Sequence, residues 1–491
     1  MRGARSLLLA GVAGKLVGVF RELLLAALYG TSGPVAAYRV AQTATLIPIN
    51  FFTADALSAG FLPNETRMLR ANEAQAAAFY IVVNRLILGI SVVLTLGLLV
   101  ARDLWVRVLA PGLDQSITTL AASMLVAMAL GVPFYLSTAM GSYLEMAHGR
   151  FALASARASV QSVGLIVGTV AAYVLDRPTL LAWGFTLAYA VLAIWTRIRL
   201  RAIGLPVPQR PGEYPGLLRE FWISIRPILL VPIALQGSFA VERSVASLIS
   251  SDTVAALDYA RLVTETAMAL VAAPLGLAVL ANIGAMTAAD TTSLVEDLLR
   301  RCLLIFVPIS VALVTLASPV TQLVFVRGAF DAESSKTTAS ILTGLAFGLW
   351  AQVTSYVMVK ALSGRHRNGL AAICVGAGSL VMIGSDLMLY RSLGPLALGL
   401  GASLGAATQF CLASAFHRIP GTALRELWRF TPPTVGCLAL YSLAHQSLIS
   451  LERSWWVESA IGVFSMTPMV AWLALSRQNR SELTRLLRAR S

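Results

Sequence analysis

The sequence is poor in charge, in cysteine and in histidine. Only 13% of its 491 residues are charged, whereas an ordinary soluble domain carries about 25%. The four cysteines and four histidines form no CxxC pair and no metal-ligand spacing, which argues against a disulfide framework and a zinc site. There is no Walker A loop and no H-E-x-x-H motif. The sequence therefore indicates neither a soluble globular protein nor an enzyme.

Apolar residues fill most of the chain. They make up 57% of it, and the mean hydropathy is +0.75. Windows of about 20 apolar residues, the length that crosses a bilayer, recur along the whole sequence and predict about fourteen transmembrane helices. We therefore expect an all-α polytopic membrane protein, and expect it in the inner (plasma) membrane.

The formal net charge is +14. Most of the basic residues lie in alternate connections between the apolar windows, together with both ends of the chain. The positive-inside rule then predicts that both termini are cytoplasmic. The basic balance is thus an orientation signal and does not indicate nucleic acid as a partner.

The two halves of the chain resemble each other. Arg21 precedes Arg39 by eighteen residues, as Arg243 precedes Arg261, and an external amphipathic segment follows the third helix of each half, at 104–114 and 323–331. The pattern predicts two parallel six-helix repeats plus two C-terminal helices, an arrangement found in rocking-type transporters. The expected parts are an N-terminal lobe (1–200), a proline-rich cytoplasmic linker (201–220), a second lobe (221–418), and two extra helices with a basic cytoplasmic tail (419–491).

Charges within the predicted spans are the main functional signal, because a charge in the bilayer is costly unless it faces a partner, a cavity or a substrate. Guanidinium groups bind phosphate oxygens in a bidentate manner, so a cationic cavity would suit a diphosphate headgroup. The candidate substrate-binding residues are Lys15, Arg21, Arg39, Arg243 and Arg261, with Glu22, Asp55, Asp258 and Glu265 in support. The alternative is that these residues only form ion pairs between helices.

Three further patterns bear on packing or coupling. Asp386 interrupts an apolar run and, with Glu242, is a candidate site for a coupling ion, Na⁺ or a proton; no other cofactor is expected. Gly399, Gly401 and Gly405 place small residues along one helix, which predicts close helix packing. Arg157 lies near a predicted span end, where its side chain is expected to reach the interface.

Three stretches resemble the MviN/MurJ-type lipid II flippases of the multidrug/oligosaccharidyl-lipid/polysaccharide (MOP) exporter superfamily. They are Gly14 to Glu22 with Ala59 to Pro63, Val241 to Leu262, and Val326 to Asp331. The resemblance implies two six-helix lobes around a cationic cavity that alternates between the two sides of the membrane. It carries family cavity arginines onto Arg21 and Arg261, and more loosely onto Lys15. The family has arginine in the middle of helix 2, where this chain has Asn50.

The expected function is a flippase that moves a polyprenyl-diphosphate-linked saccharide to the outer leaflet by alternating access. The substrate is lipid II or an exopolysaccharide or other oligosaccharide unit, since departures such as Asn50 leave the saccharide open. The expected partners are the undecaprenyl-diphosphate-linked saccharide, membrane lipids and other envelope-polysaccharide biosynthesis proteins. The alternatives are a drug/cation antiporter of the same superfamily and, with less support from the short loops, a membrane glycosyltransferase or polymerase.

Overall fold

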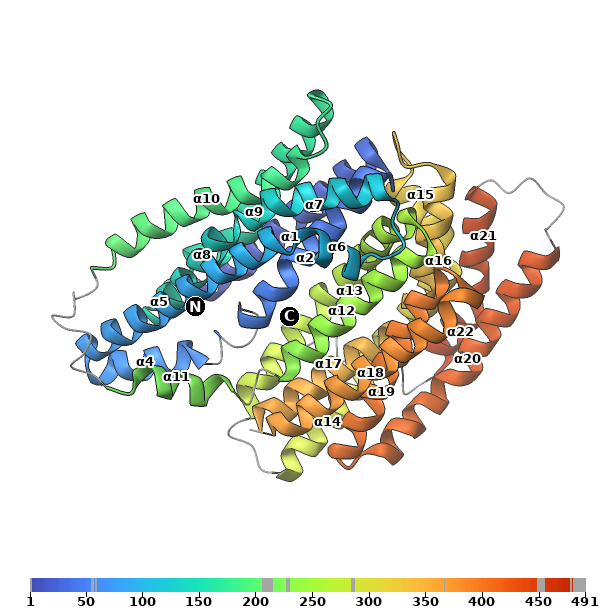
Figure 1. Cartoon of the computed structure of the whole chain (residues 1–491). Coiled ribbons are helices and arrows are strands. Elements are labelled where there is room, and N and C mark those ends of the chain that lie inside the picture. The colour runs from blue at the N-terminus through green and yellow to red at the C-terminus, as the bar shows by residue number, and fades with distance from the viewer. Residues whose placement is uncertain are drawn as a thin grey trace. The chain divides into compact units, whose positions relative to one another are not determined.

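The computed structural model describes residues 2–53, 57, 60–204, 215–226, 230–283, 288–365, 367–447, 455–476 and 479. These residues form helices and short connections, with no strand among them, so the predicted all-α class is confirmed (Figure 1). Within these ranges seven helices are long and apolar enough to cross a membrane, or up to nine if each of two bent pairs is one span. The protein is a multi-pass membrane protein, and the count of fourteen spans stays a prediction.

The chain forms two compact units. Unit 1 comprises Met1–Ala255 and Arg327–Phe330, and unit 2 comprises Ala256–Val326 and Asp331–Ser491. The helices of unit 1 are α1 (Arg2–Tyr29), α2 (Gly33–Thr53), α4 (Leu62–Ala71), α5 (Glu73–Val100), α6 (Arg102–Leu109), α7 (Gln115–Ala129), α8 (Val132–Ala147), α9 (Ala152–Val174), α10 (Leu180–Arg201), α11 (Leu217–Ile225) and α12 (Leu230–Ile249).

Helix α13 (Ser251–Ile283) begins in unit 1 and continues in unit 2. The other helices of unit 2 are α14 (Ala288–Thr315), α15 (Ala317–Phe325), α16 (Ala332–Phe347), α17 (Leu349–Gly364), α18 (Asn368–Leu393), α19 (Leu396–Phe416), α20 (Pro420–Ser447), α21 (Trp455–Ser465) and α22 (Thr467–Leu475). Within the unit, α18 packs against α19, and α19 also packs against α16 and α17.

The order of helices recurs in the two halves. The long helices α5 and α14 are each followed by a short helix, α6 or α15. Helix α6 covers the start of the predicted external segment at 104–114, and α15 overlaps the start of the one at 323–331. A bent pair follows in each half: α7 and α8 meet at 44°, and α16 and α17 meet at 49°. The apolar windows at these two places are therefore helical but broken.

The compact units divide the chain at Ala255, beyond the expected linker at 201–220. The reason is that α12, the first helix after the linker, packs against α2 and α6 of unit 1. Gly112 follows α6 and comes so close to Ser247 of α12 that an added Cβ would lie 2.2 Å from the Ser247 carbonyl oxygen. The expected lobes are defined by the repeat and not by packing, and they stay a prediction.

Two short amphipathic helices, α4 and α11, lie side by side in unit 1 (Figure 1). Helix α11 buries Leu217, Phe221 and Ile225, which recur every four residues on one face. Its polar face reaches α4, where Arg67 pairs with Glu220 and Asn64 Nδ2 donates to Ser224 Oγ at 2.9 Å.

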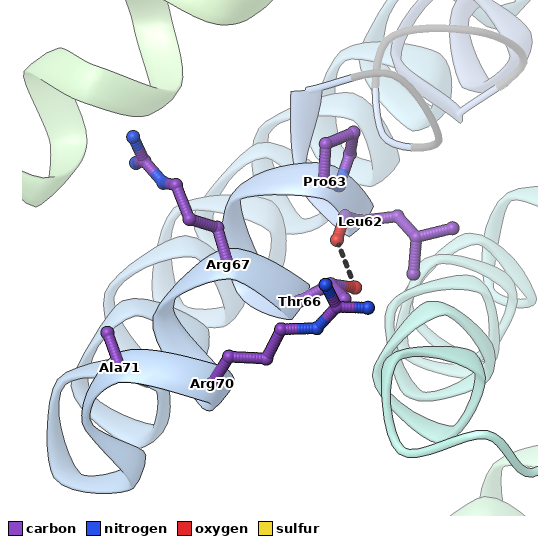
Figure 2. Close-up of a pocket in the computed structure, with 6 residues that line it drawn as sticks. All are labelled: Leu62, Pro63, Thr66, Arg67, Arg70 and Ala71. Atoms are coloured by element: carbon purple, nitrogen blue, oxygen red, sulfur yellow. Dashed lines mark hydrogen bonds between the residues drawn. The ribbon is translucent and has the colours of Figure 1, made fainter.

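Figure 2 shows that Arg67 and Arg70 extend to opposite sides of α4, while Thr66 donates to the Leu62 carbonyl at 2.8 Å. Together with Leu62, Pro63, Thr66 and Ala71, the two arginines line a pocket of about 500 Å³. Because Arg67 is the arginine that pairs with α11, the described end of the expected linker is fixed to unit 1 through this side of α4.

Candidate functional site

A buried carboxylate joins the first two helices. Glu22 on α1 accepts hydrogen bonds from the guanidinium groups of Arg21 on the same helix and Arg39 on α2, and it forms an ion pair with each. Arg39 also donates to the Gln42 amide oxygen at 3.2 Å. Such a cluster is stable in an apolar environment only because each charge has a partner at hydrogen-bonding distance. The structure thus brings together three of the predicted site residues.

The two arginines differ in how far they can be reached. The side chain of Arg21 is 21% exposed, whereas that of Arg39 is 4% exposed. Lys15, two turns before Glu22 on α1, is exposed. Lys15 and Arg21 are therefore more accessible than Arg39, which contacts Glu22 from the buried side.

Helix α12 adds a second pair of buried charges to unit 1. Arg243 is buried and donates to the Val254 carbonyl at 2.6 Å, and the neighbouring Glu242 is 1% exposed. Since α12 packs against α2, the helix that carries Arg39, the arginines predicted on α1, α2 and α12 belong to one packed unit. Unit 1 therefore holds four of the predicted cations, Lys15, Arg21, Arg39 and Arg243, together with the predicted acids Glu22 and Glu242.

The other predicted substrate-site residues lie elsewhere. Arg261 and Asp258 are half-buried on α13 in unit 2, and Glu265 on the same helix is exposed. Asn50 is half-buried on α2. Asp55 lies outside the described residues. The binding role of each residue stays a prediction.

Asp386 on α18 is fully buried against α19. Gly401 makes room for it, because an added Cβ there would lie 1.9 Å from Asp386 Oδ1. An added Cβ would lie 2.6 Å from the Gly378 carbonyl oxygen at Gly405 and 2.3 Å from the Ile341 carbonyl oxygen at Gly399, so the predicted close packing of the small residues is confirmed. Within the described residues no group of three or more His, Cys, Asp or Glu side chains is placed to hold a metal ion. Glu242 belongs to unit 1 and Asp386 to unit 2, and the coupling-ion site stays a prediction.

Ser403 has the G-x-S-x-G spacing of a hydrolase nucleophile, from Gly401 to Gly405. The structure gives it a different role. Ser403 lies within α19, and its hydroxyl donates to the Gly344 carbonyl of α16 at 2.6 Å. A nucleophile elbow requires a sharp turn between a strand and a helix, so this serine is a packing residue.

Arg157 does not extend to the interface as predicted. Its guanidinium lies 4.5 Å from the centre of the Tyr135 ring, bonds to the Tyr135 hydroxyl, and donates to the Tyr189 hydroxyl at 3.4 Å. Tyr189 in turn donates to Gln161 Oε1 at 2.9 Å. Aromatic faces and hydroxyls thus replace water around this cation. Sequence spacing gave no signal for it, since Tyr135, Arg157 and Tyr189 come from three different helices.

Two buried acids at the ends of unit 1 helices are absent from the sequence prediction. Glu145 on α8 accepts from Arg199 at 2.6 Å and from the Leu153 backbone N–H at 2.8 Å. Glu65 on α4 is also fully buried, but neither of its carboxylate oxygens has a hydrogen-bond partner within the described structure. Both residues lie at the margins of apolar runs, where an acid is normally read as a solvated loop residue.

The environment of Glu65 predicts a specific pH dependence. Helix α4 is not one of the helices long enough to cross a membrane, and burial raises the pKa of Glu65 from 4.5 to about 8. Between these values the folded state binds a proton that the unfolded state has lost, so stability falls as the pH rises through this window. The Glu65→Gln variant should therefore have the same melting temperature as the parent near pH 4.5. Its melting temperature should exceed that of the parent by an increasing margin as the pH rises towards 8. The difference is at most a few kcal/mol, at about 1.4 kcal/mol per pKa unit.

Melting curves of the two proteins in detergent from pH 4.5 to 9 test this prediction. Glu73 and His148, which line the same pocket as Glu65, are present in both proteins. A difference in melting temperature that does not change with pH would contradict the raised pKa.

Comparison with known proteins places this geometry in a family. The family described as lipid II flippase MurJ matches residues 25–464. The probable lipid II flippase MurJ of Synechocystis sp. is 24% identical over 92% of this chain and 88% of its own length. That of Rhizobium meliloti is 24% identical over 78% of this chain and 74% of its own length.

Solved structures show the same fold. A lipid II flippase MurJ in an inward closed conformation superposes with a TM-score of 0.80 at 17% identity, covering 95% of this chain and 98% of that one. An inward-facing multidrug resistance transporter of the MATE family, in the MOP superfamily, reaches a TM-score of 0.70 at 17% identity over 84% of this chain and 96% of that one. The family match spans most of the sequence and includes Arg39, Glu242 and Arg243, while Lys15, Arg21 and Glu22 lie just before its first residue; the chain belongs to the MurJ family of lipid II flippases.

Proposed function

We propose that this protein moves lipid II, a polyprenyl-diphosphate-linked saccharide, from the cytoplasmic to the outer leaflet of the inner membrane. The family match supports the substrate class. The observation that carries the mechanism is the Glu22 cluster, in which one acid holds two arginines inside an apolar unit and leaves Arg21 partly open. A half-open guanidinium can exchange one carboxylate contact for a bidentate contact to a phosphate.

The residues then divide into two roles. Arg21 and Lys15 are the binding groups of unit 1 for the diphosphate, and Arg261 is the binding group of unit 2. Arg39 is a positioning residue, because it contacts Glu22 from the buried side. Arg243 is held by the Val254 carbonyl, and it adds positive charge to the cluster.

Two further features belong to the proposal. The basic connections favour cytoplasmic termini, and a monovalent ion, Na⁺ or a proton, at Asp386 or Glu242 would bias the transport cycle. A cationic site also weighs against a drug/cation antiporter, because the exported drugs are themselves cationic and would be repelled by it.

Single substitutions of the binding arginines test the assignment. Arg21→Ala and Arg261→Ala should each lower the rate of lipid II translocation about ten- to a hundredfold, since a hydrogen bond to a charged group contributes about 1.5–3 kcal/mol. The measurement is the appearance of lipid II at the outer leaflet, read with an accessibility probe, in cells whose own flippase is depleted. Arg85→Ala is the matched control, since Arg85 is an exposed arginine on α5. Normal translocation by both binding-site variants would refute the site.

The identity of the saccharide needs its own experiment. Depletion of this protein in its host should cause lipid II to accumulate on the cytoplasmic side, as identified by mass spectrometry with the same probe. Accumulation of another polyprenyl-linked saccharide would show that departures such as Asn50 have changed the substrate.

A further inference from the structure

A polar pocket of about 350 Å³ lies at one end of unit 1, away from the Glu22 cluster. It is lined by Glu65 and Leu69 of α4, Glu73, Ala76 and Ala77 of α5, Ala147 and His148 at the end of α8, and Ile203 and Gly204 after α10. None of these residues has a role in the proposed transport cycle. The pocket is therefore a separate feature that requires its own explanation.

The charge of the pocket favours a cation. Glu65 and Glu73 supply two carboxylates, and the pocket wall also includes the ends of α8 and α10. A helix C-terminus carries a partial negative charge, because its last carbonyls have no partner within the helix. His148 Nδ1 lies 3.0 Å from the Leu144 carbonyl, so Nδ1 is the donor of this hydrogen bond.

Glu65 is the observation that points to a ligand. It is fully buried, lines the pocket, and has two carboxylate oxygens without a hydrogen-bond partner. A buried polar group without a partner costs about 1–3 kcal/mol, and more if it is charged. Glu145, a few residues before His148, shows how the same unit satisfies a structural acid, with Arg199 and a backbone N–H. Glu65 has no such internal partner, which is the condition expected of a group that receives its partner from outside.

The volume of the pocket and the side chains in its wall limit the class of cation that it can bind. A volume of about 350 Å³ is far larger than a bare metal ion needs, and the described residues offer no cluster of three metal-ligating side chains. The polar groups in the wall are acceptors that suit N–H donors. We propose that this pocket binds a primary ammonium group, with Glu65 as its charge partner. The ammonium can come from an ethanolamine lipid headgroup or from a soluble amine.

Thermal stability of the full-length protein in detergent tests the pocket directly. At pH 8.5, where the carboxylate form of Glu65 is populated, saturating ethanolammonium chloride should raise the melting temperature by about 2–4 °C. Tetramethylammonium chloride, which has no N–H donor, and sodium chloride at equal ionic strength should not. The shift should be lost in Glu65→Gln and kept in Glu333→Gln, an exposed acid on α16 that controls for the change in net charge.

The source of the ammonium is distinguished in nanodiscs. If a lipid headgroup fills the pocket, the protein melts higher in phosphatidylethanolamine than in phosphatidylcholine, and ethanolammonium adds a further shift only in phosphatidylcholine. If the ligand is a soluble amine, the added shift is equal in both lipids. An equal shift from tetramethylammonium or sodium, or a shift that survives Glu65→Gln, would overturn the proposal.

Discussion

Glu22→Ala should be among the most damaging single substitutions in this protein. It removes the carboxylate that Arg21 and Arg39 both contact, and the side chain of Arg39, which is 4% exposed, loses its ion pair with Glu22. Breaking a buried ion pair by removing one partner costs about 3–5 kcal/mol, which is a large part of the stability of a typical domain. We expect a markedly lower melting temperature in detergent and loss of translocation.

A second variant separates folding from transport. Glu22→Gln/Arg39→Gln replaces the buried charges by a neutral pair, and it should recover most of the melting temperature that Glu22→Gln alone loses. Translocation should stay impaired, because Arg21 would lose the group that positions it. An unchanged melting temperature in Glu22→Ala would show that the cluster is not a buried ion pair, and full translocation by the double variant would remove Arg39 from the mechanism.

Gly328→Ala is the second substitution with a large expected effect. The turn Arg327–Phe330 packs on the end of α1 in unit 1, where the Ala329 N–H donates to the Ala27 carbonyl at 2.8 Å. Gly328 has φ = +60°, and an added Cβ would lie 2.2 Å from that same carbonyl oxygen. A left-handed conformation costs a non-glycine residue about 1–2 kcal/mol, and the clash with backbone adds to this. We expect the docked turn to lose at least about tenfold in population.

Hydrogen–deuterium exchange of the peptide that contains Ala329 measures this effect, since its amide is protected only while the turn is docked. Gly149→Ala is the matched control, because Gly149 has φ = +70° with no atom within 4 Å of an added Cβ. The control should show backbone strain alone and leave exchange at Ala329 unchanged. Equal exchange in the parent and in Gly328→Ala would mean that the turn moves to accommodate the methyl group.

The sequence was sufficient for the helical class and for most helix positions, because long apolar windows admit almost no other structure in a bilayer. It also identified Arg21, Glu22 and Arg39 as residues of one cluster. It could not decide which cation faces Glu22, since an ion pair across seventeen residues depends on the rotation of two helices about their axes. For the same reason, the sequence could not predict that Tyr135 and Tyr189 lie around Arg157.

Other features left a weak signal in the sequence. The break between α7 and α8 coincides with Gly131 and with Pro133, which lacks a backbone donor in the first turn of α8. These two residues mark the position of the break, which the apolar windows alone did not predict. Glu65 gave no such signal, because the burial of α4 depends on packing against α5 and α8, which no local pattern encodes.

The two bent helix pairs have a consequence for how this architecture tolerates change. The first bend contains Gly131, Val132 and Pro133, while the second contains Phe347, Gly348 and Leu349 and has no proline. Their angles nevertheless differ by only a few degrees, 44° and 49°. Both bends have a glycine directly before the second helix, Gly131 and Gly348. An added Cβ would lie 2.8 Å from Thr186 Oγ1 at the first position and 2.4 Å from Ser403 Cα at the second. The feature that the two bends share is therefore close packing at a glycine, and not a proline. Substitution of Pro133 should leave the path of the chain intact, whereas a larger residue at either glycine should disturb it.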